Sequence, residues 1–145
     1  MSIIFKNRTN LRDAGKRLSE EREKRLKIIL EQETGEIVRR TTSGKDYNNA
    51  PFVPYSKQYR AFREKKGRSI TPNLTLGIRT SKKSPASGML KSITSTVRRD
   101  GTTLIGKIFP RPDQVLKVIG NNKLRPFFGL AKEQIERIRK YVKGT

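Results

Sequence analysis

The chain has 145 residues, with 34 Lys and Arg against 13 Asp and Glu, which gives a formal net charge of +21 at pH 7. It contains no His and no Cys, which excludes catalysis by a nucleophile–His pair, zinc sites built from His or Cys, and disulfide bonds. A surplus of positive charge this large repels itself, so we expect an anionic partner and a binding or structural role in place of catalysis.

The length fits one domain over residues 1–145, with a small core. No stretch approaches the ~20 apolar residues that cross a bilayer, and the apolar run near the start is too short for a signal peptide. We therefore expect a soluble protein made inside a cell, alone or as part of an assembly. Residues 56–145 carry +17 of the +21 charges, whereas the first part of the chain is charge-mixed.

Residues 10–34 are predicted to form a long charged helix that Thr9 or Asn10 caps and Gly35 ends. Its apolar stripe is thin, so we expect the helix to project or to pack on a neighbouring subunit; an ordinary solvated surface helix is the alternative. Acidic residues precede basic ones by four positions on this helix, in the orientation that favours ion pairs. These pairs are Asp13–Arg17, Glu20–Lys24, Glu21–Arg25 and Glu23–Lys27.

The following α+β body, residues 36–145, is predicted to begin with a short strand, Glu36–Thr41, and a polar loop. Pro51 and Pro54 forbid a helix between them. Ser56 is a suitable N-cap for a second helix over Lys57–Lys66, which Gly67 ends. Three aromatic side chains are expected on one side of this helix: Tyr55, Tyr59 and Phe62.

The middle of the chain predicts a short strand, Asn73–Ile78, and a mobile loop near 79–88. After a helical turn at Met89 and Leu90, a strand over Ile93–Arg99 leads to Asp100-Gly101, a strong hairpin signal. The return strand is expected at Thr102–Phe109.

Pro112 and Asp113 suit the first turn of a short apolar helix, which we expect to end in a turn at Gly120-Asn121-Asn122. A final helix is predicted over Lys132–Lys143. The expected fold is α+β: a small, mostly antiparallel sheet with a β-hairpin, packed by three to four helices including a long N-terminal helix.

The order of motifs over residues 50–140 resembles that of tailed-bacteriophage virion-morphogenesis proteins, the tail-completion or head–tail joining proteins that include those of Mu-like and P-two-like phages. The sharpest similarities are Gly88–Ile93 (GMLKSI) and Arg125–Leu130 (RPFFGL), with the hairpin between them and a helix after them. The chain departs from the family in having no His between hairpin and RPFFGL, and in having Ala131 where members usually place a Ser or Thr cap.

The resemblance implies a structural protein with no reaction and no cofactor, assembled as a ring at the neck or tail top of the virion and made in the host bacterial cytoplasm. Its implied partners are further copies of itself and neighbouring phage neck and tail proteins, with double-stranded DNA in the channel as another; a membrane or a small-molecule substrate is not implied. Arg and aromatic residues are frequent in interface hot spots. The candidate subunit interface is therefore Arg125, Phe127, Phe128 and Leu130, and core packing is the alternative for the two Phe residues.

Basic residues in the second half are candidate contacts to DNA or to an acidic partner, although such runs are often simply solvated. They are Lys57, Arg60, Arg63, Lys65, Lys66, Arg68, Arg79, Lys82, Lys83, Arg98 and Arg99. We expect Arg79, Lys82 and Lys83 on a loop that faces the ring's channel or an acidic neighbour.

Two alternatives to a ring-forming connector remain open from the sequence. One is a sequence-nonspecific nucleic-acid-binding protein of ribosomal or architectural type, in which the basic residues form one face with Tyr55, Tyr59 and Phe62 interleaved. The other is a metal-dependent nuclease using Asp113 and Glu133, although acids at helix starts have a plainer electrostatic explanation.

Overall fold

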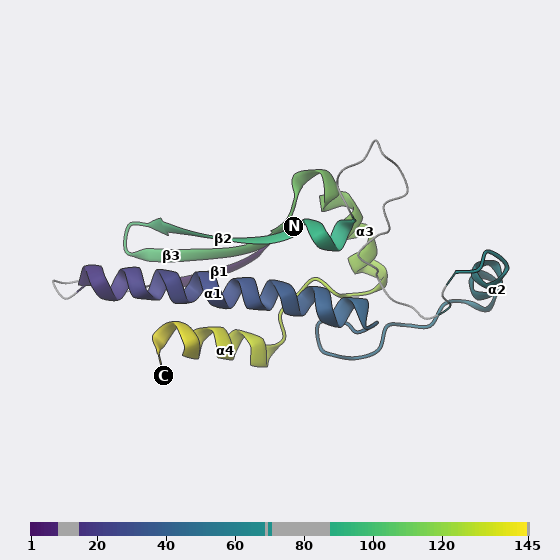
Figure 1. The fold of residues 1–145 in the computed structure, drawn as a ribbon, viewed down its shortest axis with the longest axis horizontal. Coiled ribbons are helices and arrows are strands. Elements are labelled where there is room, and N and C mark those ends of the chain that lie inside the picture. The colour runs from purple at the N-terminus through teal and green to yellow at the C-terminus, as the bar shows by residue number, and fades with distance from the viewer. Residues whose placement is uncertain (9–14, 69, 71–87, 145) are drawn as a thin grey trace.

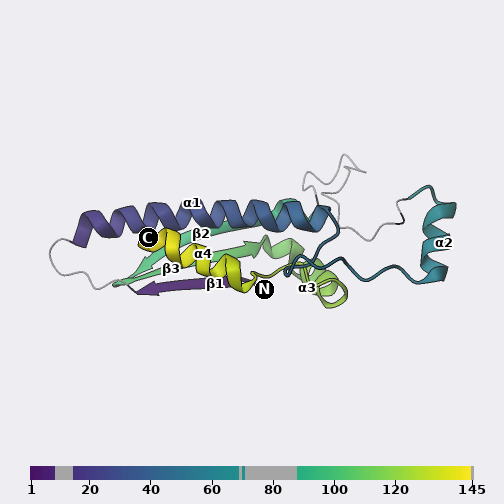
Figure 2. The ribbon, with the colours of Figure 1, turned by 90° about the horizontal axis from the view of Figure 1, so that it is seen from below.

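The computed structural model describes residues 1–8, 15–68, 70 and 88–144 of the chain. The body has three layers: a three-stranded sheet, the long helix α1 (Gly15–Thr42) and the C-terminal helix α4 (Lys132–Lys143), with α1 in the middle (Figure 1). Helix α3 (Val115–Leu124) lies at one end of the sheet, and α2 (Lys57–Lys65) is set apart from the body beyond that end (Figure 2). The predicted α+β fold with a small antiparallel sheet is confirmed.

The sheet has the strand order β1-β3-β2, with β1 at Ile3–Arg8, β2 at Ile93–Asp100 and β3 at Thr103–Pro110, and both pairings are antiparallel. Strand β1 is an addition to the predicted elements. It pairs with β3, a segment far from it in the sequence, and Ile3 lies opposite Ile108.

The β2–β3 hairpin is confirmed, but its turn lies one residue later than predicted. Asp100 and Thr103 pair, so the loop residues are Gly101 and Thr102. Gly101 has a φ of +57° in the first loop position, which is the glycine placement of a type II′ turn. The return strand therefore begins at Thr103 and extends to Pro110.

Helix α1 does not end at Gly35, and the predicted strand over Glu36–Thr41 is wrong. The buried positions Leu30, Glu33, Ile37 and Arg40 continue one helical face past the glycine. Burial of this face against the rest of the body outweighs the roughly 1 kcal/mol that a mid-helix glycine costs relative to alanine. A first helix of residues 10–34 is thus replaced by one that extends to Thr42.

The core lies on both sides of α1. Toward the sheet, Leu26 and Leu30 pack over Gly106, where a side-chain Cβ would collide with Leu30 Cδ1. Gly106 therefore lets α1 approach β3 closely, as glycines in strands often do for a neighbouring element. Other core side chains are fully or almost fully buried, and they come from all three layers: Ile29, Ile37, Leu104, Ile108, Phe127, Ile138 and Val142.

The remaining predicted elements are largely confirmed. The turn at Met89–Ser92 is a 3₁₀ helix, α2 begins after Ser56 as expected, and α4 has the predicted bounds. A 3₁₀ turn at Pro112–Gln114 precedes α3, which continues through the predicted turn at Gly120 to Leu124. The predicted strand at residues 73–78 and almost all of the predicted loop at 79–88 lie outside the described residues.

Candidate interaction surfaces

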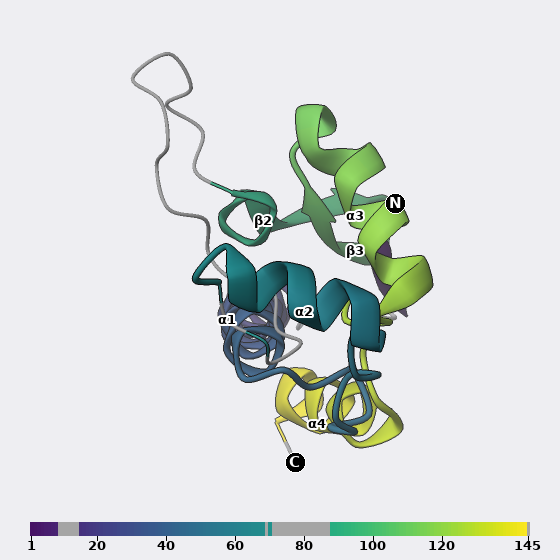
Figure 3. The ribbon, with the colours of Figure 1, turned by 90° about the vertical axis from the view of Figure 1, so that its right-hand side faces the viewer.

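Helix α2 and its flanks form a projecting segment, here called the α2 arm (residues 53–68). Ser56 caps the helix: its Oγ accepts a hydrogen bond from the backbone N of Tyr59 at 3.3 Å. Gly67, with a φ of +63°, ends it. No residue of α2 is buried, and seen along the long axis of the molecule the helix crosses in front of the body (Figure 3).

The aromatic side chains of the arm contact one another. The ring centroids of Tyr55 and Tyr59 are 5.0 Å apart, edge to face, and those of Tyr59 and Phe62 are 6.2 Å apart and stacked. The Arg63 guanidinium lies over Tyr55 at 5.0 Å from its centroid. Despite these contacts, Tyr59 is 44% exposed and Phe62 is 49% exposed, so the arm presents a solvent-facing aromatic surface.

The predicted basic residues of this region do gather on the arm. Six cations and one acid occupy residues 56–68: Lys57, Arg60, Arg63, Lys65, Lys66 and Arg68 against Glu64. Glu64 lies 3.6 Å from Arg60, in an exposed ion pair of little energetic weight. The arm thus combines an excess of positive charge with exposed aromatic side chains.

Arg98 and Arg99, which the sequence placed on one basic face, lie on opposite faces of the sheet. Successive residues of a strand point to opposite sides. Arg99 opposes Leu104 on the side of α1 and donates to Glu23 Oε2 at 2.8 Å, whereas Arg98 opposes Ile105 on the outer side. Placing Arg99 on the same basic face as Arg98 was therefore wrong, and Glu23 pairs with Arg99 of β2.

The outer face of the sheet, the side away from α1, brings together two cations that are not among the predicted contact residues. Lys6 of β1 and Lys107 of β3 join Arg98 there, because the register sets Lys6 and Arg98 on either side of Ile105. Residues two apart on a strand point to the same side. Once the strand pairing is known, this spacing places Lys6 of IIFK and Lys107 of TLIGKIF on the outer face.

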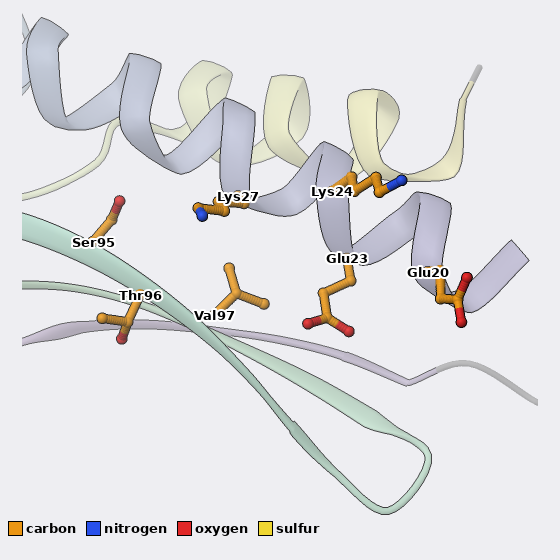
Figure 4. Close-up of a pocket in the computed structure, with 7 residues that line it drawn as sticks. All are labelled: Glu20, Glu23, Lys24, Lys27, Ser95, Thr96 and Val97. Carbon is orange, nitrogen blue, oxygen red and sulfur yellow. The ribbon is translucent and has the colours of Figure 1, made fainter. Parts of the chain in front are cut away.

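A groove of about 520 Å³ runs between α1 and β2, lined by four charged residues of the helix and three small residues of the strand (Figure 4). The lining residues are Glu20, Glu23, Lys24, Lys27, Ser95, Thr96 and Val97. Its two acids and two lysines balance, and Glu23 already pairs with Arg99. The groove therefore has neither the converging carboxylates of a hydrolytic site nor a dominant charge.

The RPFFGL segment is a core element more than a surface one. Phe127 is 0% exposed and Phe128 is 4% exposed, so their assignment to a subunit interface is wrong and core packing is right. Arg125 lies 4.8 Å from the centroid of Tyr55 and so joins the base of the α2 arm to the body. Leu130 is half-buried against the core.

A network of buried polar side chains holds the RPFFGL segment between α1 and α4. Arg40 donates to the carbonyls of Phe127 at 3.0 Å and Gly129 at 2.5 Å, and to Gln134 Oε1 at 2.8 Å. Gln134 Nε2 donates to Glu33 at 2.7 Å. The network ends in an ion pair between Glu33 and Arg137 at 2.5 Å.

Burial is the largest influence on the pKa of Arg40, the cation at the centre of these hydrogen bonds. It lowers the pKa of the Arg40 guanidinium below its ordinary value, and nearby carboxylates, Glu36 foremost, act in the opposite direction. Arginine remains protonated under such shifts. Gln134 also accepts from the backbone N of Ala131 at 2.9 Å, which supplies one bond of a helix cap where the side chain of Ala131 supplies none.

The metal-dependent nuclease alternative rests on two acids, Asp113 and Glu133. Asp113, one of the two acids of the nuclease alternative, accepts from Gln114 Nε2 at 2.7 Å and pairs with Arg111 at 3.3 Å. The hydrogen bond from Gln114 lowers the pKa of Asp113. No cluster of three or more Asp and Glu is placed to hold a metal ion among residues 1–8, 15–68, 70 and 88–144.

Three predicted contact residues, Arg79, Lys82 and Lys83, lie outside the described residues. Within the part that is described, no helix has the length and apolar character needed to span a bilayer. Comparison with protein-family models, with curated proteins and with solved structures finds no match for this chain.

Proposed function

We propose that this chain is a structural virion protein of a tailed bacteriophage, a tail-completion or head-to-tail connector component that assembles as a ring and joins the tail to the DNA-filled head. The order of the GMLKSI, hairpin and RPFFGL motifs before a closing helix supports the family. The absence of His and Cys from the sequence favours a structural role over most kinds of catalysis.

The observation that carries the proposal is the unburied α2 helix. An isolated helix of nine residues is marginal in water, because helix formation needs a costly nucleus and most helical stability in proteins comes from packing. Here the packing surface exists, in Tyr59 and Phe62, but nothing in the described body covers it. Such a helix is suited to lie against another protein, as amphipathic helices do when they enter an apolar groove.

The net charge supports an assembled working state as well. A monomer with +21 charges in 145 residues repels itself. Acidic neighbours or nucleic acid in a particle relieve that repulsion, and a ring with a DNA-filled channel offers both.

Conditional loss of the protein during infection tests the proposal. The expected result is a lysate with DNA-filled heads and complete tails that remain separate, and that join into infectious particles when the purified full chain is added. Normal joined particles in the absence of the protein would refute the proposal.

The second candidate is a sequence-nonspecific nucleic-acid-binding protein, and the six cations of the α2 arm favour it. It predicts a protein that binds duplex DNA as a free species and is missing from purified particles. Mass spectrometry of particles purified on a density gradient separates the two candidates.

A further inference from the structure

The outer face of the sheet is a second surface that lacks a cover. Figures 1 and 3 show α1 and α4 on the opposite side, and α3 only at one end of the strands. Outward-pointing residues include Ile4 and Lys6 on β1, Ile105 and Lys107 on β3, and Arg98 on β2. Ile4 is 49% exposed, whereas Ile105 is only 6% exposed.

The burial of Ile105 on an uncovered face follows from its two register partners. Lys6 and Arg98 flank it on the neighbouring strands, and long basic side chains cover apolar surface with their stems while the charged ends stay in water. Two cations are thus set on either side of the same residue. Strands are about 4.8 Å apart, so the Cα atoms of Lys6 and Arg98 are on the order of 10 Å apart.

Lys107 makes the third cation of this group, here called the outer basic face (Lys6, Arg98 and Lys107). It lies two residues along β3 from Ile105, on the same side of the strand, and pairs in register with Ile4 and Thr96. Arg98 and Lys107 line a common hollow of about 400 Å³ together with Thr96 and Phe109.

Asp100 is the carboxylate on this side of β2, two residues after Arg98 and opposite Thr103. Among the described residues, no carboxylate lies within ion-pair distance of Lys6, Arg98 or Lys107. Lys107 is the diagonal neighbour of Lys6 and of Arg98 on the flanking strands, a separation of about 7–8 Å at which long side chains of like charge can still repel each other. An external anion that bridges them would remove this repulsion.

The composition of the face favours phosphates over a protein surface. Threonines at positions 94, 96 and 103 alternate with the cations on the outer side, and hydroxyl, Lys and Arg groups are the usual donors to nucleic-acid phosphates. The exposed aromatic side chains typical of protein interface hot spots are on the α2 arm. A duplex carries one charge per ~1.7 Å of its axis, so a face this wide meets several phosphates at once.

We propose that the outer basic face binds the phosphate backbone of duplex DNA without reading its sequence, and that it is the wall of the ring that faces the channel, with α1 and α4 on the outside. The orientation in the ring rests on the proposed function. The binding of duplex DNA by Lys6, Arg98 and Lys107 does not, because it is a property of a single subunit.

The test measures binding of the full chain to a fluorescein-labelled 20-base-pair duplex of mixed sequence, by fluorescence anisotropy over a range of salt concentrations. The face variant is Arg98→Glu with Lys107→Glu. The control variant is Lys132→Glu with Lys140→Glu, on exposed positions of α4 behind α1. Both variants have a net charge of +17, against +21 in the parent chain, and thermal unfolding confirms that each is folded.

The face variant is expected to lose at least about tenfold in affinity for the duplex at ~100 mM salt, and the slope of log affinity against log salt concentration should fall by about 2. The control variant should keep most of the parent's affinity and most of its slope. Equal losses in the two variants, or no binding by the parent chain at ~50 mM salt, would overturn the inference. So would tighter binding of polyglutamate than of the duplex through the same two residues, since that outcome assigns the face to an acidic protein.

Sedimentation velocity on the same samples separates this inference from the proposed function. A ring whose duplex binding is indifferent to Arg98 and Lys107 refutes the inference and leaves the ring intact. A chain that stays monomeric but binds duplex through these residues supports DNA binding by the outer basic face and argues against assembly as a ring.

Discussion

Arg40 of α1 and Gln134 of α4, 94 residues apart in the sequence, are joined by a buried hydrogen bond of 2.8 Å. Arg40 also holds the carbonyls of Phe127 and Gly129, so one guanidinium connects the long helix, the closing helix and the RPFFGL segment. This relationship gives the motif that carries the family resemblance a structural role: it is held in place from the inside of the subunit.

Replacing Arg40 by Met should therefore destabilise the fold by ~2–4 kcal/mol, because the carbonyls and the Gln134 oxygen lose a charged donor in a buried site. The matched control is Arg39→Met. Arg39 is the preceding residue, its side chain is 74% exposed, and its pair with Glu36 at 2.6 Å lies at the surface, where such pairs contribute ~0–1 kcal/mol. Urea denaturation measures both, and equal effects would contradict the importance of the buried network.

Gly35→Ala should stabilise the protein by ~0.5–1 kcal/mol. The glycine is inside α1, no neighbouring atom lies within 4 Å of a Cβ added there, and alanine is the better helix former. The result distinguishes the observed helix from the predicted one, since a glycine that ended a helix with positive φ would resist replacement. A loss of stability in thermal unfolding would indicate that α1 ends near residue 35.

Gly106→Ala should have the opposite sign, with a loss of ~1–3 kcal/mol, because the new methyl group meets Leu30 and forces α1 away from β3. Combining it with Leu30→Val, which removes a methylene at the point of contact, should recover part of that loss. Additive losses in the double variant would show that the two residues do not press on each other.

Phe127→Ala should reduce stability by ~3–5 kcal/mol, the usual cost of removing a buried aromatic ring. Leu124→Ala is the comparison, because Leu124 is 70% exposed and close in sequence; its effect should stay within ~0.5 kcal/mol. If Phe127→Ala left the unfolding free energy unchanged but weakened oligomers, the interface role would be restored.

Tyr59→Ala with Phe62→Ala should leave the unfolding free energy within ~1 kcal/mol of the parent, because both side chains are solvent-facing. The same change should abolish the joining of heads to tails in the complementation assay. Glu64→Gln, on the opposite side of α2 by helical periodicity, should join normally. Normal joining by the aromatic variant would show that the arm has no partner.

Elements with local signals could be predicted from the sequence, and elements without them could not. Ser56 and Gly67 bound α2, and Gly101 marks the hairpin; caps and turn glycines act on their immediate neighbours. Strand β1 depends on its pairing with β3, and the extension of α1 beyond Gly35 depends on burial against α4 and the RPFFGL segment. Neither dependence is visible in a short window of sequence.

The candidate surfaces also differ in whether their signals are local in the sequence. The α2 arm was predictable because its aromatic and basic residues lie within one short helix. The outer basic face was not, because Lys6, Arg98 and Lys107 come from three strands and the sides of those strands are set by register. Arg98 and Arg99 show the consequence: adjacent in sequence, they serve opposite faces.

Electron cryomicroscopy of the purified tailed particle tests the ring assignment most directly. The expected map contains this chain as a rotationally symmetric ring at the junction of head and tail, with the α2 arm against a neighbouring subunit or neck protein. A map without the chain at that junction, together with a purified protein that remains monomeric at every concentration, would contradict the account.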